Sequence, residues 1–139
     1  MKLDIQRGHR IYEKLLRVAP DVRHILLYAK SSVPGFIDLH LDVLDRTPEY
    51  RRIVLSHYWK HPSGDMIPDP DMSIAVFFDR AQAEALTYQD AHRYEVAYTT
   101  PGEPPDLEVH TRLNVFLERW LGALAEQGHV LRLHDRTTI

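Results

Sequence analysis

One stretch near the carboxyl end, residues 113–128 (LNVFLERWLGALAEQG), constrains the fold more than any other part of the sequence. Its apolar residues recur at intervals of three and four, which is the spacing of one broad face of an α-helix. They are Leu113, Phe116, Leu117, Trp120, Leu121 and Leu124. Gly128 follows where a left-handed carboxyl-terminal cap is favoured. Such a face must be buried, and only the strands predicted upstream offer enough surface, so we expect this helix to pack on a β-sheet.

Length and composition limit the class of protein. A chain of 139 residues is expected to form a single domain, residues 1–139. The chain has 17 lysine and arginine residues against 20 acidic residues. This balance argues against a protein that binds nucleic acid mainly through its phosphates. The absence of cysteine excludes disulfides and thiolate chemistry. Neither a signal peptide nor an apolar run of about 18 residues is present, so we expect a cytoplasmic location without membrane contact.

A second helix is predicted near the amino terminus, over residues 4–19. Asp4 is a suitable N-cap, and Pro20 disfavours helical geometry in the residue before it. Gly8 weakens the helix by about 1 kcal/mol relative to alanine. An approximate apolar stripe comprises Ile5, Tyr12, Leu15, Leu16 and Ala19.

Between the helices, apolar and polar residues alternate, as in strands with one buried face. Strands are predicted over residues 24–30, 37–43, 50–59, 72–78 and 92–98, the first of which is also compatible with a helix. Residues 60–71, rich in Pro, Gly and Asp, are expected to be the longest irregular segment.

Two segments are less determined by their pattern. Residues 79–88 fit either a helix capped by Asp79 or a hairpin that turns at Asp79 and Arg80 and returns as a strand; we favour the hairpin. Asp106 is the expected N-cap of the main helix. Beyond Gly128, residues 130–134 can add a short edge strand, and the last five residues are expected to fray. The predicted fold is α+β: a curved antiparallel sheet of about five strands, with an N-terminal and a C-terminal helix packed on one face.

Three segments of the sequence resemble a known family. They are DMSIAVFFDRAQAEAL from Asp71, YTTPG from Tyr98, and the main helix. Together they are similar to the YqiB-like family of small bacterial proteins, a domain of unknown function. The positions that carry the resemblance are Met72, Asp79, Ala83, Glu84, Asn114, Phe116, Leu117, Trp120 and Leu121. The turn at Tyr98 and the tail beyond Gly128 depart from the family. The resemblance implies the α+β fold, a bacterial cytosolic setting and no particular activity; it also favours the hairpin over residues 79–88.

The sequence predicts neither a metal site nor a cofactor. Of its nine histidines the nearest useful pair is His57 and His61, and four residues of a strand span about 13 Å, too far for one ion. Asp65, Asp69 and Asp71 lack the spacing of a calcium loop. A glycine-rich phosphate loop, a nucleophile elbow and an HExxH motif are all absent from the sequence.

Five residues are candidates for ligand binding: Asp79, Glu84, Tyr98, Asn114 and Trp120. Asp79 and Glu84 flank the predicted turn; the alternative is a turn-forming Asp and an outward Glu. Asn114 either bonds a neighbouring backbone, which we favour, or lines a pocket. Trp120 is expected in the core, with its indole N–H at a pocket edge.

These features favour a non-catalytic module that binds a small molecule or a protein. One alternative is a homodimeric interaction protein, suggested by Phe77 lying opposite the apolar face of its strand. Another is a small hydrolase or isomerase that uses Asp79 and Glu84. No catalytic residue is assigned. A weak basic patch formed by Arg51, Arg52, Lys60, Arg80 and Arg93 does not outweigh the acidic balance, so nucleic acid is not the expected partner.

Overall fold

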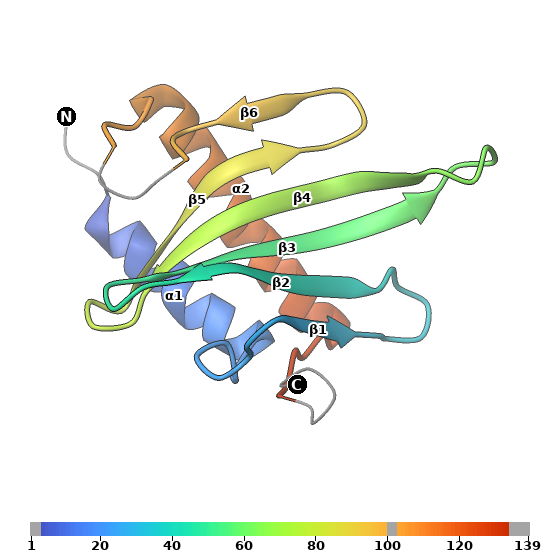
Figure 1. Cartoon of the computed structure of the whole chain (residues 1–139), viewed down its shortest axis with the longest axis horizontal. Helices are drawn as coiled ribbons and strands as arrows, with labels where there is room; N and C mark the ends of the chain where they lie inside the picture. Colours follow the sequence, from blue (N-terminus) through green and yellow to red (C-terminus); the bar gives the residue numbers. More distant parts are fainter. Residues whose placement is uncertain (1–3, 100–102, 134–139) are drawn as a thin grey trace.

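A computed structural model describes residues 4–99 and 103–133 of the chain. It shows a six-stranded antiparallel sheet with two helices on one face (Figure 1). The elements in chain order are α1 (Ile5–Val18), β1 (Tyr28–Ser31), β2 (Leu39–Arg46), β3 (Arg51–Lys60), β4 (Met66–Phe77), β5 (Gln82–Gln89), β6 (Tyr94–Val96) and α2 (Leu107–Gln127). The α+β prediction is therefore confirmed, with six strands in place of about five.

Each strand pairs with the next in the sequence, so the sheet is a simple meander. The segment 79–88 forms a hairpin with the preceding strand, as favoured from the sequence, since Met72 pairs with Tyr88 and Phe77 with Gln82. Short antiparallel connections of this kind need no crossover. Because no helix is needed to connect the strands, both helices can pack on the same face of the sheet.

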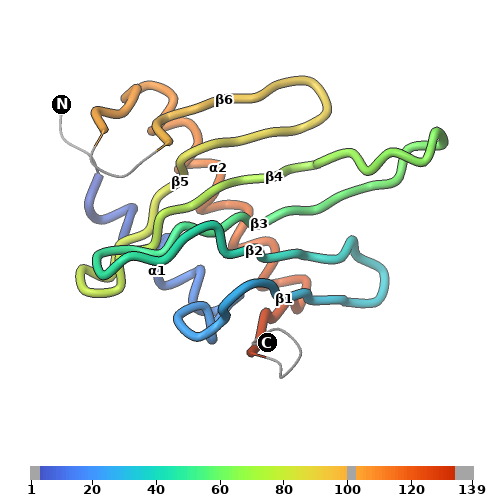
Figure 2. Tube along the Cα trace, in the orientation of Figure 1, coloured from blue at the N-terminus to red at the C-terminus, as the bar shows by residue number. Residues whose placement is uncertain are grey.

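The prediction of a long loop over residues 60–71 is wrong. Met66–Phe77 is one strand, and only residues 61–65 turn between β3 and β4. The end of this hairpin projects beyond its neighbours (Figures 1 and 2), because Tyr58 pairs with Pro68 where β2 and β5 no longer pair with it. An unflanked strand has a free edge, and proline is tolerated there because no partner needs its missing N–H.

Both helices begin and end close to where the sequence places them. The Asp4 carboxylate accepts the Arg7 N–H (2.9 Å), and the Asp106 carboxylate accepts the Val109 N–H (3.2 Å). Gly128 caps α2 in the left-handed region, with φ 96°. The apolar faces of α1 and α2 are buried against the sheet, where they meet the inward residues of β2, β3 and β4. The largest fully buried side chains include Ile11, Leu15, Leu39, Leu41, Ile53, Leu55, Met72, Ile74, Leu117 and Leu121.

Three smaller predictions need correction. The first strand is only Tyr28–Ser31, because Ile25 turns into the core instead of extending the edge. The strand predicted over 92–98 is limited to Tyr94–Val96. Residues 130–133 form no strand; the buried Leu131 donates its N–H to Val18 (2.6 Å) and so follows the end of α1. Residue 134 and the tail predicted to fray lie outside the described residues.

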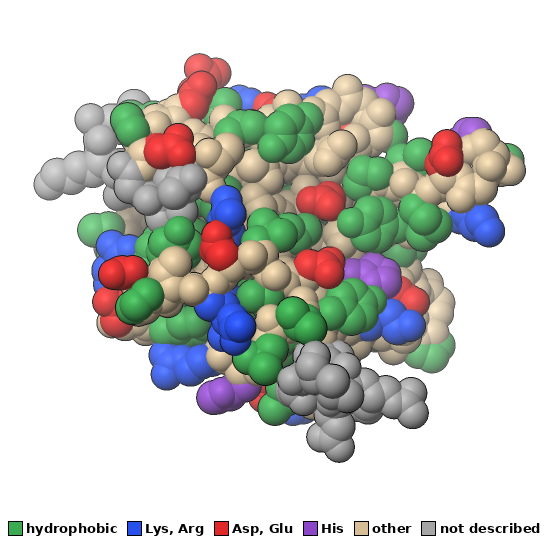
Figure 3. All heavy atoms as spheres, in the orientation of Figure 1, with side chains coloured by type: hydrophobic (Ala, Val, Ile, Leu, Met, Phe, Trp, Pro, Cys, Tyr) green, Lys and Arg blue, Asp and Glu red, His purple; other side chains and the backbone are tan. Residues whose placement is uncertain are grey.

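The opposite face of the sheet is covered by neither helix (Figure 1). Figure 3 shows this face, on which acidic, histidine and hydrophobic side chains gather. Within residues 4–99 and 103–133, neither helix has the length and apolarity needed to cross a membrane.

Candidate functional site

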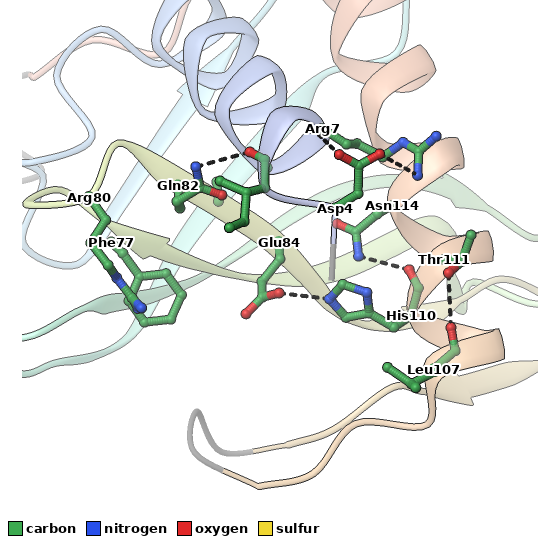
Figure 4. A pocket seen from close by; sticks show the side chains of 13 residues that line it. Asp4, Arg7, Phe77, Arg80, Gln82, Glu84, Leu107, His110, Thr111 and Asn114 are labelled. Atoms are coloured by element: carbon green, nitrogen blue, oxygen red, sulfur yellow. Dashed lines mark hydrogen bonds and ion pairs between the residues drawn. The ribbon is translucent and has the colours of Figure 1, made fainter. Parts of the chain in front are cut away.

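A cavity of about 320 Å³ lies at the end of the molecule where both helices begin (Figure 4). Its walls come from the first turns of α1, from the hairpin between β4 and β5, and from the first turns of α2. Three segments far apart in the sequence therefore meet around one space.

The edge of β5 explains why α2 meets the sheet here. β6 pairs with β5 only from Thr87 to Gln89, which leaves the first half of β5 without a strand on that side. Asn114 of α2 takes the place of a strand: its Oδ1 accepts the Ala85 N–H (2.8 Å), and its Nδ2 donates to the His110 carbonyl (2.8 Å). This is the backbone-bonding role favoured for Asn114 from the sequence, although the side chain also lies on the cavity wall.

The start of α1 is held against β5 by a close approach at Gly8. A Cβ atom on Gly8 would lie 2.1 Å from Gln82 Oε1, so the helix can sit this near only with glycine or with a displaced glutamine. The Gln82 amide donates to the Ile5 carbonyl (3.1 Å) and joins the first turn of α1 to the strand. These two contacts fix the first turn of α1 against β5, where it forms one wall of the cavity.

Glu84 is the central polar group of the cavity. Its carboxylate accepts a hydrogen bond from the Tyr98 hydroxyl and one from His110 Nε2 (2.7 Å). Tyr98 and His110 are buried, whereas 21% of the Glu84 side chain remains exposed. The carboxylate is thus oriented by two groups from different parts of the chain and still faces the cavity.

Electrostatics keep Glu84 ionised and Tyr98 protonated. Burial acts to raise the pKa of Glu84, but the hydrogen bonds from His110 and Tyr98, together with the charges nearby, outweigh it and hold the pKa below its ordinary value. Burial and the adjacent carboxylate raise the pKa of Tyr98 far above that of a free phenol. At neutral pH the pair is a carboxylate and a hydroxyl donor.

A guanidinium and apolar surface complete the cavity. Glu84 lies between His110 on one side and Phe77 and Arg80 on the other (Figure 4). The Arg80 guanidinium stacks on the Phe77 ring, 4.1 Å from its centroid, and forms no ion pair with any residue of the described chain. By contrast, the Arg7 guanidinium is engaged by Asp4 (3.5 Å). Arg80 therefore has no ion pair among the described residues, although its charge helps to hold the pKa of Glu84 low.

The described residues contain no cluster of three or more His, Asp or Glu side chains arranged to hold a metal ion. The polar groups of the cavity bond one another and the backbone instead. What the arrangement offers is a fixed carboxylate, a guanidinium without an ion pair among the described residues, and apolar walls.

Three of the five candidate residues come together at this cavity: Glu84, Tyr98 and Asn114. Asp79 does not join them, since it is exposed and lines a separate cavity of about 150 Å³ beside Arg23 and Arg46. The Asp79 and Glu84 pairing that the hydrolase or isomerase alternative requires is therefore not formed. Trp120 is further along α2, where it packs against His57 and Phe116.

Several residues of the cavity were not identified from the sequence. His110 precedes Asn114 by four positions and so shares its helical face once Asp106 is accepted as the cap, a signal that was present in the pattern. Arg80 and Gln82 carried no such signal, because their role depends on how the β4–β5 hairpin meets α1. Topology, not local pattern, brings them to the cavity.

The fold and the site define an α+β protein in which a meander sheet carries two helices on one face and a cavity at their shared end. Residues 10–130 match the family model DUF6908, a domain of unknown function, and the chain belongs to that family. No curated protein and no solved structure matches the chain. The resemblance was correct in pointing to a domain of unknown function, but nothing links the chain to the YqiB-like family.

Proposed function

We propose that this protein is a non-catalytic binding module, and that the cavity between the starts of α1 and α2 takes a small molecule. The observation that supports this most strongly is the ionised Glu84, which is held by Tyr98 and His110 and faces a space of about 320 Å³. Ligand sites are typically apolar cavities of this size or larger with a few fixed polar groups. Glu84 would be the polar anchor.

The chemistry of the walls limits the ligand. Each carboxylate oxygen of Glu84 accepts one hydrogen bond and retains capacity for another, so it suits an ammonium or an N–H donor. Arg80 suits a carboxylate or another acceptor at the opposite side. Ile5, Phe77 and Leu107 provide apolar surface between them. A compact molecule with an apolar body, a donor or cationic group and an acceptor group fits these features.

Binding is favoured over acid–base catalysis by the state of the same carboxylate. A general acid or base works best with a pKa near the operating pH. The pKa of Glu84 is held low and that of Tyr98 is raised, so neither group is suited to exchange a proton at neutral pH. This supports an anchoring role for the pair.

A fragment screen by protein-observed NMR tests the proposal. Small amines, amino acids and uncharged analogues would be titrated into the wild-type protein and into Glu84→Gln, with Glu126→Gln as a matched control on the exposed side of α2. We expect amine-containing fragments to shift amides of β5 and of the first turns of α1 and α2. Affinity should fall about tenfold in Glu84→Gln, which corresponds to about 1.4 kcal/mol, and remain unchanged in the control. Equal affinities for all three proteins would contradict the assignment of Glu84.

Homodimer formation is a second candidate, supported by the projecting end of the β3–β4 hairpin. Its side chains Trp59 and Met66 are 38% and 58% exposed, which is unusual for an isolated hairpin with no partner. Phe77, the original reason for this hypothesis, is buried within the chain and no longer supports it. Light scattering of the wild-type protein and of Trp59→Ser/Met66→Ser tests it: a monomer in both cases removes this candidate.

A further inference from the structure

The face of the sheet that carries no helix has a polar and aromatic cluster at its centre. Its members project from four adjacent strands, β1 to β4. We define this open-face cluster as Tyr28, His40, Asp42, Tyr58 and Asp71. The strand register places them side by side, because Tyr28 pairs with Asp42, while His40 and Asp71 both pair with Ser56.

The aromatic members contact one another. The Tyr28 hydroxyl and His40 Nδ1 share a hydrogen bond (2.5 Å), and their ring centroids are 5.9 Å apart. The His40 ring lies 5.8 Å from that of Tyr58. Burial lowers the pKa of His40, so the imidazole is neutral at pH 7 and adds aromatic surface without positive charge. Three rings thus form a continuous platform on the open face.

The carboxylates beside these rings lack cations. The Asp42 carboxylate has no hydrogen bond or ion pair within the described part of the chain, and the Asp71 carboxylate accepts one hydrogen bond, from the Tyr58 hydroxyl (3.2 Å). Burial raises the pKa of Asp42. Burial also raises the pKa of Asp71. The hydrogen bond from Tyr58 acts to lower this pKa, and the nearby charge of Asp42 acts to raise it. Burial thus disfavours the charged form of both carboxylates, and a bound cation would offset this cost.

A buried hydroxyl lies beneath the same cluster. Ser56 is fully buried between His40 and Asp71. It lies near enough to Tyr58 to lower the pKa of that phenol, yet its Oγ has no partner at hydrogen-bonding geometry among the described residues. Buried polar atoms are normally satisfied, so Ser56 is a polar group under the cluster whose hydrogen-bonding capacity the described residues leave unused.

The basic residues nearby do not neutralise the cluster. Lys30 lies across from His40 on β1 but forms no ion pair with a described residue. Arg52, on the adjoining part of β3, is already bound to Asp45 (2.8 Å) and to the Thr99 carbonyl (2.7 Å). Asp38, just before β2, adds a further carboxylate close to Tyr28 and His40. The local charge remains negative.

We propose that the open-face cluster docks a basic segment of a protein partner, with an arginine or lysine side chain seated on the Tyr28 and Tyr58 rings against Asp42 and Asp71. Cations bind aromatic faces and carboxylates together, which is the combination present here. The surface is a strand face, not one of the two cavities described above, and so suits an extended chain more than a small molecule. The projecting β3–β4 hairpin beside it adds exposed apolar contact surface from Met66, which pairs with Lys60 on the same face as Tyr58. This proposal is independent of the cavity.

NMR titration with defined peptides tests the proposal. The probe is an acetylated octapeptide of alternating arginine and glycine, and its counterpart carries glutamate in place of arginine. Asp42→Asn/Asp71→Asn removes the two carboxylates, and Glu13→Gln/Glu126→Gln removes the same amount of charge from exposed positions on the helices. Asp42→Asn alone replaces the double variant if the latter fails to fold, because the Asp42 carboxylate has no hydrogen bond or ion pair with a described residue to lose.

We expect the basic peptide to shift amides of β1 to β4 on the wild-type protein, and the acidic peptide to leave them unchanged. Removal of the cluster carboxylates should weaken binding about tenfold or more, whereas the control pair should change it less than about twofold. Equal weakening in both pairs would show only long-range attraction and would overturn the proposal. So would shifts confined to the cavity, or no shift at all. Self-association that is lost in Asp42→Asn/Asp71→Asn would replace the basic partner with a second copy of the chain.

Discussion

Replacement of Asn114 by alanine should destabilise the protein more than truncation of any exposed side chain on α2. Asn114 is 3% exposed, and its amide satisfies the Ala85 N–H on an edge of β5 that no other strand of the described residues covers. Alanine leaves this buried N–H without an acceptor, which costs about 1–3 kcal/mol. The better helix propensity of alanine returns at most about 0.7 kcal/mol. The net loss in the free energy of unfolding is therefore about 1.5 kcal/mol.

Urea and thermal unfolding measure this loss, and amide exchange locates it. For a chain of this length we expect the melting temperature of Asn114→Ala to fall by about 3–6 °C. Arg119→Ala is the matched control, because Arg119 is exposed on the same helix; it should change the free energy of unfolding by less than about 0.5 kcal/mol. The Ala85 amide should exchange faster in Asn114→Ala than in the control. Equal stability of the two variants, or unchanged exchange at Ala85, would refute the argument that Asn114 serves as the edge partner of β5.

Three further outcomes follow from the structure. Because the pKa of Glu84 is lower in the folded protein than its ordinary 4.5, its stabilising effect is complete above that pH and is lost as the pH falls; Glu84→Gln should therefore flatten the acid side of the stability profile measured by urea unfolding. Gly8→Ala should be less favourable in the wild-type protein, where it displaces the end of the Gln82 side chain, than in a Gln82→Ala background, where it should stabilise by up to about 1 kcal/mol; a double-mutant cycle measures the difference. Because the pKa of Asp42 is raised in the folded protein, Asp42→Asn should increase stability at pH 7, and the gain should vanish well below pH 3.8; a loss of stability at pH 7 would mean that the carboxylate has a partner in the chain.

The helices and the hairpin over 79–88 were predictable because their signals are local. The apolar spacing of α2, the carboxylates of Asp4 and Asp106, and Gly128 each act within a turn or two of the backbone. Residues 66–71 were misjudged as a loop because Pro68 and Pro70 read as strand breakers. The composition does not reveal that this part of β4 has a free edge, where proline is tolerated.

The site was predictable only in part, for a related reason. Glu84 was chosen as a carboxylate flanking the predicted turn and Asn114 as a polar amide on the apolar helix, and both line the cavity. The hydrogen bond between Glu84 and His110 joins residues 26 positions apart and depends on where β6 stops pairing with β5. Arg80 lies at the cavity because the turn after β4 places it on the Phe77 ring. Such contacts follow from topology, which local periodicity does not specify.

Native mass spectrometry of the wild-type protein and Glu84→Gln, each incubated with a small-molecule cell extract, tests whether Glu84 anchors a ligand in the cavity. We expect a stoichiometric added mass on the wild-type protein that is small enough for a cavity of about 320 Å³ and is strongly reduced on Glu84→Gln. Glu126→Gln should retain it. An added mass that persists on Glu84→Gln, or no added mass on the wild-type protein, would contradict the assignment of the cavity as a ligand site anchored by Glu84.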